Sequence, residues 1–292
     1  MYTHTLKKLP KNTSEILVNV DKDTIQKEYK ISFAKLLQNF EMQGFRKGKV
    51  PASIAEKHLK KETVYEELIR RIIPKIYDEI SKKEDIKPVI QPKIELEKAN
   101  ESEDWQIKIT VASKPTITLG DYKESIKKIK SDQKKDQIWT PGKDTTKSEE
   151  SEKDKSKKQQ ELMNQVLSAV LKETTIEISD LIIEEELNQR LANLLTEIQK
   201  IGLTVDSYLK SKNMTKDDLN KRYKDEIEQT YKLEFVLADI ADKENIKVEN
   251  SDLEKLFAGI SDPKEREAAR TNSYFYASVL RKQKTLDYLL AL

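Results

Sequence analysis

Apolar residues recur at three- and four-residue spacing along the C-terminal half of this chain. The clearest stripes are Leu162, Val166, Leu167, Val170 and Leu171; Leu187, Leu191, Leu194, Leu195 and Ile198; and Leu219, Tyr223, Ile227, Tyr231 and Phe235. Such stripes are typical of amphipathic helices that pack against one another. The 292 residues include only six glycines and eight prolines, and 36% are charged, which favours long solvated helices over a turn-rich β sandwich or barrel. We therefore predict that residues 159–292 form a mostly α-helical, elongated domain.

Short motifs predict where several of these helices begin and end. The expected start signals are two capping boxes, Thr215 with Asp218 and Ser251 with Glu254, and a cap followed by proline, Asp262–Pro263. In each motif a side-chain oxygen can accept a hydrogen bond from the free N–H groups of the first turn. Gly202 is expected to end one helix. The last helix is expected to run over 268–292.

The first 112 residues combine strand and helix patterns. Strands are expected at 14–20, 90–96 and 105–111, and amphipathic helices at 22–40, after a cap at Asp21, and at 64–80. The strands follow from apolar alternation and the helices from apolar stripes. Pro74 cannot donate to the carbonyl of Arg70, so we expect a kink or a break between two shorter helices there. Residues 1–112 are predicted to be a small α+β domain.

The stretch 131–158 differs in composition from the rest. It holds eight lysines against seven acidic residues, and its only large apolar side chains are Ile138 and Trp139. A segment of this kind cannot bury enough apolar surface to order itself. We expect 113–158 to be a connector followed by a flexible, charged linker. A phosphorylated or partner-binding segment is the alternative.

The chain lacks the residue patterns of common catalytic and cofactor sites. It has no cysteine, only His4 and His58 as histidines, and neither a GxxxxGK[ST] nor a GxGxxG motif. This leaves little for metal binding, nucleophilic catalysis or nucleotide binding. The net charge of +2 predicts no general attraction to DNA or membranes. No apolar N-terminal segment and no membrane-length apolar window occur, so we expect a soluble cytoplasmic protein without catalytic residues, cofactor or metal.

One loop carries an unusual combination of residues. Residues 44–51 read GFRKGKVP, and six cations against Glu56 alone lie between positions 44 and 61. An aromatic ring beside Arg46 and Lys47 suits docking on a surface of protein and phosphate, because arginine pairs with carboxylate or phosphate while the ring fills an apolar pocket. The alternative is an ordinary turn between helices with Phe45 in the core. The spacing leaves both interpretations open.

This loop resembles the ribosome-binding signature of the trigger factor family of bacterial chaperones. It lies, as in that family, before a helix with the sequence Glu66-Glu67-Leu68, and weaker similarity covers 86–92, 105–111, 178–187 and 208–240. The ribosome-binding residues that the resemblance implies are Gly44, Phe45, Arg46, Lys47, Gly48, Lys49 and Pro51. The resemblance implies an ATP-independent chaperone that docks at the ribosomal exit tunnel and shields nascent chains during folding and export. Its expected partners are a tunnel-exit protein, adjacent ribosomal RNA, unfolded polypeptides and, as a weak homodimer, a second copy.

The chain departs from that family in the middle. Trigger factors usually carry an FKBP-type prolyl isomerase domain between their two halves. Here 132–139 resembles the connector that leads into that domain, but a charged segment follows and helical pattern resumes at Gln160. We expect no isomerase domain and no isomerase activity. The alternatives are a prolyl isomerase like full-length relatives, a ribosome-free holdase similar to periplasmic folding factors, and an RNA-binding scaffold that uses the cations of 46–61.

Overall fold

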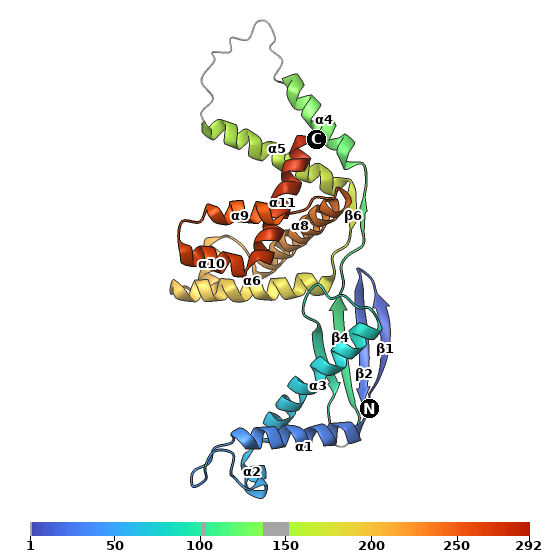
Figure 1. Cartoon of the computed structure of the whole chain (residues 1–292), viewed down its shortest axis with the longest axis vertical. Helices are drawn as coiled ribbons and strands as arrows, with labels where there is room; N and C mark the ends of the chain where they lie inside the picture. The colour runs from blue at the N-terminus through green and yellow to red at the C-terminus, as the bar shows by residue number, and fades with distance from the viewer. Residues whose placement is uncertain (1, 101–102, 137–151) are drawn as a thin grey trace. The chain divides into compact units, whose positions relative to one another are not determined.

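The computed structural model describes residues 2–100, 103–136 and 152–292 (Figure 1). Its contacts divide the chain into two compact units. The first unit comprises Met1–Lys114 with Ser179–Ile182, and the second comprises Pro115–Ile178 with Ile183–Leu292. The first is mixed α and β and the second is largely helical, so the predicted fold class is confirmed.

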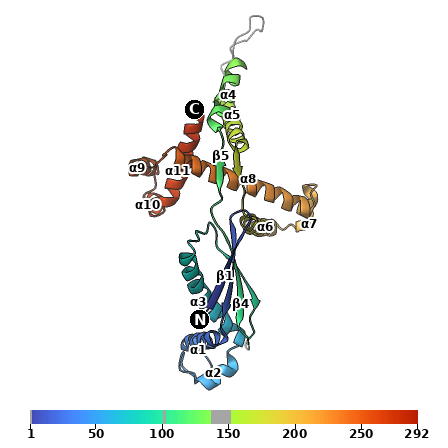
Figure 2. The ribbon, with the colours of Figure 1, turned by 90° about the vertical axis from the view of Figure 1, so that its right-hand side faces the viewer.

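The first unit is built on a four-stranded antiparallel sheet with the order β1-β2-β4-β3. Its strands are β1 (Tyr2–Leu9), β2 (Thr13–Val20), β3 (Lys93–Lys98) and β4 (Trp105–Ala112), and its helices are α1 (Lys22–Asn39), α2 (Ala52–His58) and α3 (Lys61–Lys83). Helix α3 lies along one face of the sheet (Figures 1 and 2).

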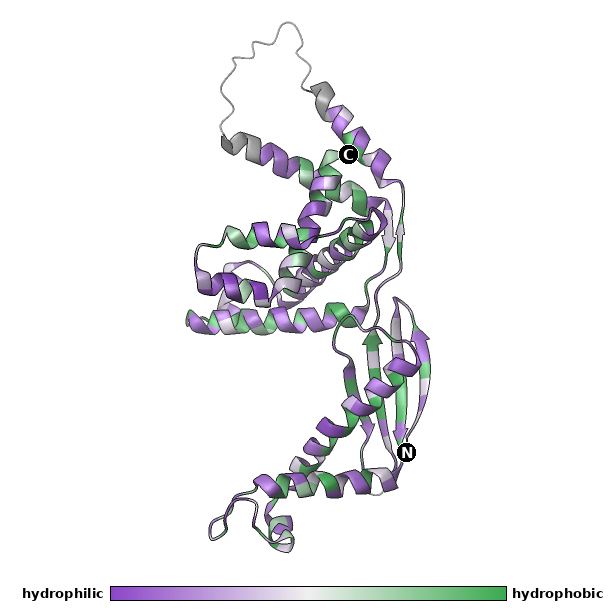
Figure 3. Ribbon diagram, viewed as in Figure 1, coloured by the Kyte–Doolittle hydropathy of each residue, from purple (hydrophilic) through white to green (hydrophobic). Residues whose placement is uncertain are grey.

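Alternation along the two central strands creates the core of this unit. Ile16 faces Ile109 and Val18 faces Ile107 across the β2–β4 ladder, and all four side chains are buried. The apolar stripe of α3 covers this face with Leu68, Ile72, Ile73, Ile76 and Ile80. Figure 3 shows the apolar residues concentrated on these central strands. Packing of this kind stabilises a small sheet that could not persist in water alone.

Three features of the first unit differ from the sequence prediction. Strand β1 was missed, because its exposed positions are threonines and lysines. Its first residue contacts α3, because the Tyr2 hydroxyl donates a hydrogen bond to the Glu79 carboxylate over 2.6 Å. Pro74 lies inside the single helix α3, so of the predicted kink or break, the break into two helices is wrong. Ile72, Ile73 and Ile76 are buried on either side of it, and their packing offsets the lost hydrogen bond. Asp21 precedes α1 but makes no side-chain capping hydrogen bond.

The second unit is a helical assembly with a small two-stranded sheet. Its elements are β5 (Ile117–Leu119), α4 (Tyr122–Asp136), α5 (Glu152–Lys172), β6 (Thr174–Ile176), most of α6 (Asp180–Lys200), α7 (Val205–Ser211), α8 (Lys216–Lys243), α9 (Asn250–Ala258), α10 (Pro263–Thr271) and α11 (Ser273–Ala291). Helix α4 packs on α5, and α11 packs on α8. Ile227, Val236 and Ile240 of α8 are fully buried, so this long helix supplies much of the core.

Helices extend into both ends of the predicted linker. Helix α4 continues to Asp136 and α5 begins at Glu152, so the prediction of disorder is wrong for 131–136 and 152–158. Residues 137–151 lie outside the described residues. Over residues 122–132, the part of α4 whose side chains are described, the well-buried side chains are those of Tyr122 and Ile126, so the sequence signal for this helix is short. Their i, i+4 spacing marks the face that packs on the unit.

The helix boundaries in the second unit test the capping predictions. The capping box of Thr215 with Asp218 is present, and the Asp262 side chain accepts from the N–H of Lys264 with Pro263 in the first turn, so both are confirmed. The box expected at Ser251 is wrong. Glu249 and Asp252 form it instead, because α9 begins at Asn250.

The prediction of one continuous helix over 268–292 is also wrong, because α10 ends and α11 begins on either side of Asn272. The Asn272 side-chain amide donates to the carbonyl of Ala268 over 3.2 Å. Asparagine side chains that bond to the backbone in this way compete with the helical ladder. The stop predicted at Gly202 agrees with the end of α6 at Lys200 and with the φ of +72° at the glycine.

Candidate functional site

The loop between α1 and α2 is closed by backbone hydrogen bonds. The Gly48 N–H donates to the carbonyl of Phe40 over 3.0 Å. Inside the loop that this bond closes, the Phe45 N–H donates to the carbonyl of Met42 over 3.0 Å, and just after it the Lys49 N–H donates to the carbonyl of Arg46 over 2.9 Å. Successive short bonds of this kind fix the tip without using any of its side chains. We call residues 42–49 the loop tip.

Two glycines make this path possible. Gly44 has a φ of +90° and Gly48 a φ of +70°, a region that other residues rarely adopt. A Cβ atom on Gly48 would lie 2.5 Å from the backbone oxygen of Gln38, whereas one on Gly44 would meet no atom within 4 Å. Gly48 is therefore required both by conformation and by close approach. Pro51 occupies the N-cap position, just before α2 rather than as its first residue.

The side chains of the loop tip point to solvent. Phe45 is 39% exposed, so the alternative that places its ring in the core is wrong. Arg46, Lys47 and Lys49 are exposed as well. The Lys47 Nζ lies 3.6 Å from a carboxylate oxygen of Glu41. Within residues 2–100, 103–136 and 152–292, the Arg46 guanidinium and the Lys49 ammonium have no hydrogen-bond or ion-pair partner.

The base of the loop is anchored by a different residue. Val50, directly after the tip, is 3% exposed. On the other side of it, Lys57, Lys60 and Lys61 are exposed on and after α2. The structure thus brings together all the predicted site residues on one segment, with an exposed aromatic ring, exposed cations and a buried valine that holds the base.

The second unit exposes apolar side chains that sequence reasoning did not single out. One group comprises Leu195 in α6 and Ile201 and Leu203 just after that helix, with Ile201 67% exposed. The other lies on α9 and α11 and comprises Leu256, Val279, Tyr274 and Phe275, with the two aromatic residues 87% and 62% exposed. Large exposed apolar groups of this kind mark interaction surfaces.

Beside the first of these groups is an apolar pocket of about 230 Å³. It is lined by Leu191, Leu194, Leu195, Ile198, Val205, Leu209, Lys216, Leu219 and Asn220 from helices α6, α7 and α8. Its volume suits a single apolar side chain rather than a cofactor. The three- and four-residue spacing of these leucines predicts that they lie on the apolar faces of helices. It does not predict that those faces line an open pocket.

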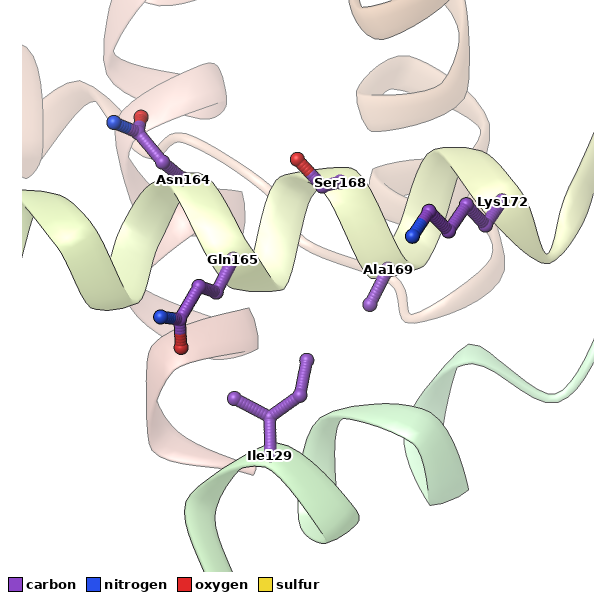
Figure 4. A pocket seen from close by; sticks show the side chains of 6 residues that line it. All are labelled: Ile129, Asn164, Gln165, Ser168, Ala169 and Lys172. Atoms are coloured by element: carbon purple, nitrogen blue, oxygen red, sulfur yellow. The ribbon is translucent and has the colours of Figure 1, made fainter. Parts of the chain in front are cut away.

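A second pocket of the helical unit, of about 380 Å³, lies between α4 and α5 (Figure 4). Ile129 points toward Gln165 and Ala169, and Asn164, Ser168 and Lys172 complete the lining. The lining carries no acid–base pair or nucleophile with a partner. Over the described part of the chain, no group of three or more His, Cys, Asp or Glu side chains could hold a metal ion. No described helix is long and apolar enough to cross a membrane.

Comparison with known proteins gives a consistent family match. A model of the bacterial trigger factor protein matches residues 2–138, and a model of the bacterial trigger factor C-terminus matches residues 143–290. The trigger factor of Lactococcus lactis subsp. cremoris MG1363 is 39% identical over 106 residues, which cover 36% of this chain and 25% of that protein. The trigger factor of Natranaerobius thermophilus is 34% identical over 119 residues, which cover 41% of this chain and 27% of that protein.

The matched segments therefore span only about a quarter of the length of these relatives. A solved structure, from work on promiscuous substrate recognition in folding and assembly activities of the trigger factor chaperone, matches with a TM-score of 0.63. The match covers 98% of this chain and 99% of that chain at 16% identity, so it supports the fold alone. The two family models together span nearly the whole sequence, and the chain belongs to the bacterial trigger factor family.

Proposed function

We propose that this chain is an ATP-independent chaperone of the bacterial cytoplasm. It docks on the ribosome beside the exit tunnel through residues 44–51 and shields emerging polypeptides during folding and export. The observation that carries the proposal is the exposed Phe45, held next to the cations of a loop tip whose backbone is closed by its own hydrogen bonds. Family membership supports it.

The loop tip combines two kinds of contact. The ring of Phe45 can fill an apolar pocket on a tunnel-exit protein, and Arg46 can pair in bidentate fashion with a carboxylate or phosphate. Lys47 and Lys49, with the cations near α2, add attraction to neighbouring ribosomal RNA. Because the tip is fixed before binding, little conformational entropy is lost when it docks. Gly44, Gly48 and Pro51 shape the loop rather than contact the ribosome.

The second unit is proposed to hold clients. Its exposed groups around Ile201 and Tyr274, and the pocket of about 230 Å³, offer separated apolar contacts among charged residues. Separated contacts of this kind bind many sequences weakly, which suits a chaperone better than a specific receptor. We assign 1–112 as the ribosome-binding domain, 113–158 as a connector in place of an isomerase domain, and 159–292 as the client-binding domain.

We infer that the chain has no prolyl isomerase activity. The two matched family ranges end at 138 and resume at 143, which leaves four residues between them and no room for a folded domain. A spectroscopic assay on a proline-containing tetrapeptide checks this. The expected rate equals that of the buffer blank, and catalysis above the blank would contradict the inference.

Co-sedimentation with bacterial 70S ribosomes tests the docking proposal. The loop variant carries Phe45→Ala, Arg46→Ala and Lys47→Ala. A matched control removes one exposed aromatic ring and two exposed cations elsewhere, as Tyr274→Ala, Lys7→Ala and Lys8→Ala. We expect the loop variant to stay in the supernatant and the control to pellet with ribosomes.

Two further outcomes separate the alternatives. A wild-type chain that stays in the supernatant at low salt would contradict ribosome docking and favour a ribosome-free holdase. Phe45→Ala alone keeps the charge constant, so unchanged binding of this variant would favour direct RNA binding through the cations, with a steep loss of affinity as salt is added.

A further inference from the structure

Strand β3 is an edge of the sheet in the first unit. It pairs with β4, and among the described residues no other strand or loop donates a backbone hydrogen bond to 93–98. Its apolar side chains, Ile94 and Leu96, point to the core face of the sheet, where their partners on β4 are buried. Ile94 and Leu96 are nevertheless 42% and 40% exposed. This edge therefore offers open backbone groups and uncovered apolar side chains to another strand.

A second copy of β3 fits this edge in one antiparallel register. Two identical strands related by a two-fold axis share one residue at the centre of their pairing. A centre at Glu95 places Ile94 opposite Leu96. It also places Lys93 opposite Glu97, and the symmetry repeats each of these contacts. Apolar side chains and opposite charges that lie directly opposite one another stabilise an antiparallel pair.

This register brings together one pair of like charges, the two Glu95 side chains at the axis. Each carboxylate is compensated within its own chain, because Lys108 Nζ lies 3.0 Å from it and Lys93 Nζ lies 3.4 Å from it. Lys93 can therefore turn toward Glu97 of the second copy while Lys108 still holds Glu95. Exposed ion pairs within a chain contribute little to stability, so this exchange costs little.

Neighbouring registers lose these contacts. Moving the centre one residue toward the C-terminus puts Glu95 opposite Glu97. Moving it one residue toward the N-terminus puts Pro92 opposite Leu96, and proline is disfavoured in a strand that is paired on both sides. The β-bulge between Leu96 and Lys98 also limits how far the regular edge extends. The pairing centred on Glu95 is therefore the favoured one.

The other edge of the sheet does not complement itself in this way. Strand β1 carries Lys7 and Lys8 and no acidic residue, so two copies of it would bring cations together. An unfolded segment could also add to β3, but it would match this edge only if it carried the same order of apolar and charged residues. A second copy always carries that order, so charge complementarity favours the copy.

We propose that two copies of this chain associate through their β3 strands in the register centred on Glu95. The pairing joins the sheets of the two first units into one, and Ile94 and Leu96 of both copies cover one another on the core face. Only residues 93–97 of each strand take part, so the contact is smaller than the about 1,200 Å² typical of stable interfaces. We expect a weak dimer that forms at micromolar or higher concentration. The association does not require the proposed chaperone function.

Sedimentation equilibrium of the full chain, from about 1 μM to about 1 mM, measures the association. Lys93→Glu and Glu97→Lys each place like charges opposite one another, so each should weaken the dimer roughly tenfold. The two changes together restore opposite charges between the strands, and they should return the dissociation constant to within about threefold of the wild type. The matched control on the other edge, Lys8→Glu, should change it less than about twofold.

Single cysteine variants report the register directly, because the chain has no cysteine of its own. Cα atoms directly opposite in an antiparallel pair lie about 4.5–5.5 Å apart, within reach of a disulfide. Under mild oxidation Glu95→Cys should form a cross-linked dimer, whereas Thr5→Cys on β1 should stay monomeric. Ile94→Cys and Leu96→Cys should not cross-link alone, but they should cross-link with each other when mixed.

Several outcomes would overturn the proposal. One is a wild-type chain that stays monomeric at the highest concentration. Another is a double charge variant, folded by its circular dichroism, that associates no more tightly than the single variants. A third is cross-linking of Thr5→Cys as fast as Glu95→Cys, or of Ile94→Cys alone. A monomeric chain in which an unfolded peptide slows amide hydrogen exchange over 93–98 would show that the edge binds an extended segment instead.

Discussion

The hydroxyl of Tyr122 donates a hydrogen bond to the carboxylate of Glu244, with 2.9 Å between Oη and Oε1. The Tyr288 hydroxyl donates to the other carboxylate oxygen over 2.7 Å, and Lys123 Nζ lies 2.7 Å from Oε1. These groups lower the pKa of Glu244 to about 2, with Lys123 the largest cause and Tyr288 the next. The cluster joins the start of α4 to the residue that ends α8 and to α11 within the second unit.

The Glu244 cluster predicts a pH-dependent stability. A carboxylate whose pKa falls on folding stabilises the fold fully above its unfolded value of 4.5, and this stabilisation is lost as the pH falls toward 2. Because the cluster is partly solvated, we expect Glu244→Gln to cost about 1–2 kcal/mol at pH 7, which lowers the Tm of the second unit by several degrees, and much less at pH 3. Far-UV circular dichroism melts at the two pH values measure this.

The matched control for that experiment is Glu185→Gln. Glu185 is an exposed carboxylate of α6. We expect its melting temperature to follow the wild type at both pH values. An equal loss of stability at pH 7 and pH 3 in Glu244→Gln would show that the carboxylate charge is not what stabilises the cluster.

The two loop glycines should respond differently to alanine. At Gly48 the new Cβ would clash with the Gln38 carbonyl, so the tip must move and ribosome binding should fall. At Gly44 only the positive φ opposes the change, at a cost of about 1–2 kcal/mol. Co-sedimentation of both variants at equal concentration measures the difference. Weaker binding by Gly44→Ala than by Gly48→Ala would contradict the assigned role of the Gly48 contact.

Phe45 and Val50 should separate docking from stability. Val50→Ala removes buried apolar surface and should lower the free energy of unfolding of the first unit by about 1–2 kcal/mol. Phe45→Ala should leave it unchanged and abolish most ribosome binding, because the ring is exposed. Urea unfolding followed by the fluorescence of Trp105, in a Trp139→Phe background, reports the first unit. A marked destabilisation by Phe45→Ala would show that the ring packs on the unit.

The exposed aromatic residues of α11 should matter for clients and not for ribosomes. We expect Tyr274→Ser with Phe275→Ser to reduce the suppression of aggregation of an unfolded model protein by several-fold, since these side chains are the most exposed aromatic surface of the described residues. Light scattering measures this effect. Ribosome co-sedimentation of the same variant is the control, and full aggregation suppression by the variant would remove the α9–α11 surface from the proposed client site.

Features formed by residues that are close together in the sequence were predicted correctly. The loop 44–51 could be found because its glycines, ring and cations are contiguous, and the Thr215 capping box could be found because its partners are three residues apart. Strand β1 could not be found, because its place is set by pairing with β2 rather than by its own alternation.

The spacing of apolar residues along a helix also did not predict which of their side chains are exposed to solvent. Tyr274 and Tyr276 both lie in an apolar stretch, yet Tyr274 is free in solvent while Tyr276 packs edge-on against Phe257. Which ring is covered depends on where α9 lies, and no spacing within α11 records this. The exposed apolar side chains of the second unit were missed for the same reason.

The hydrogen bond from Gly48 to Phe40 has a consequence for how such a chain can evolve or be re-engineered. Because backbone atoms form the hydrogen bonds that close the loop, the exposed side chains of Phe45, Arg46, Lys47 and Lys49 are not part of that closure and can be replaced without rebuilding the domain beneath. New recognition sequences that keep both glycines and Val50 can therefore be grafted at this point, which would direct the proposed client-binding unit to a partner other than the proposed ribosomal one.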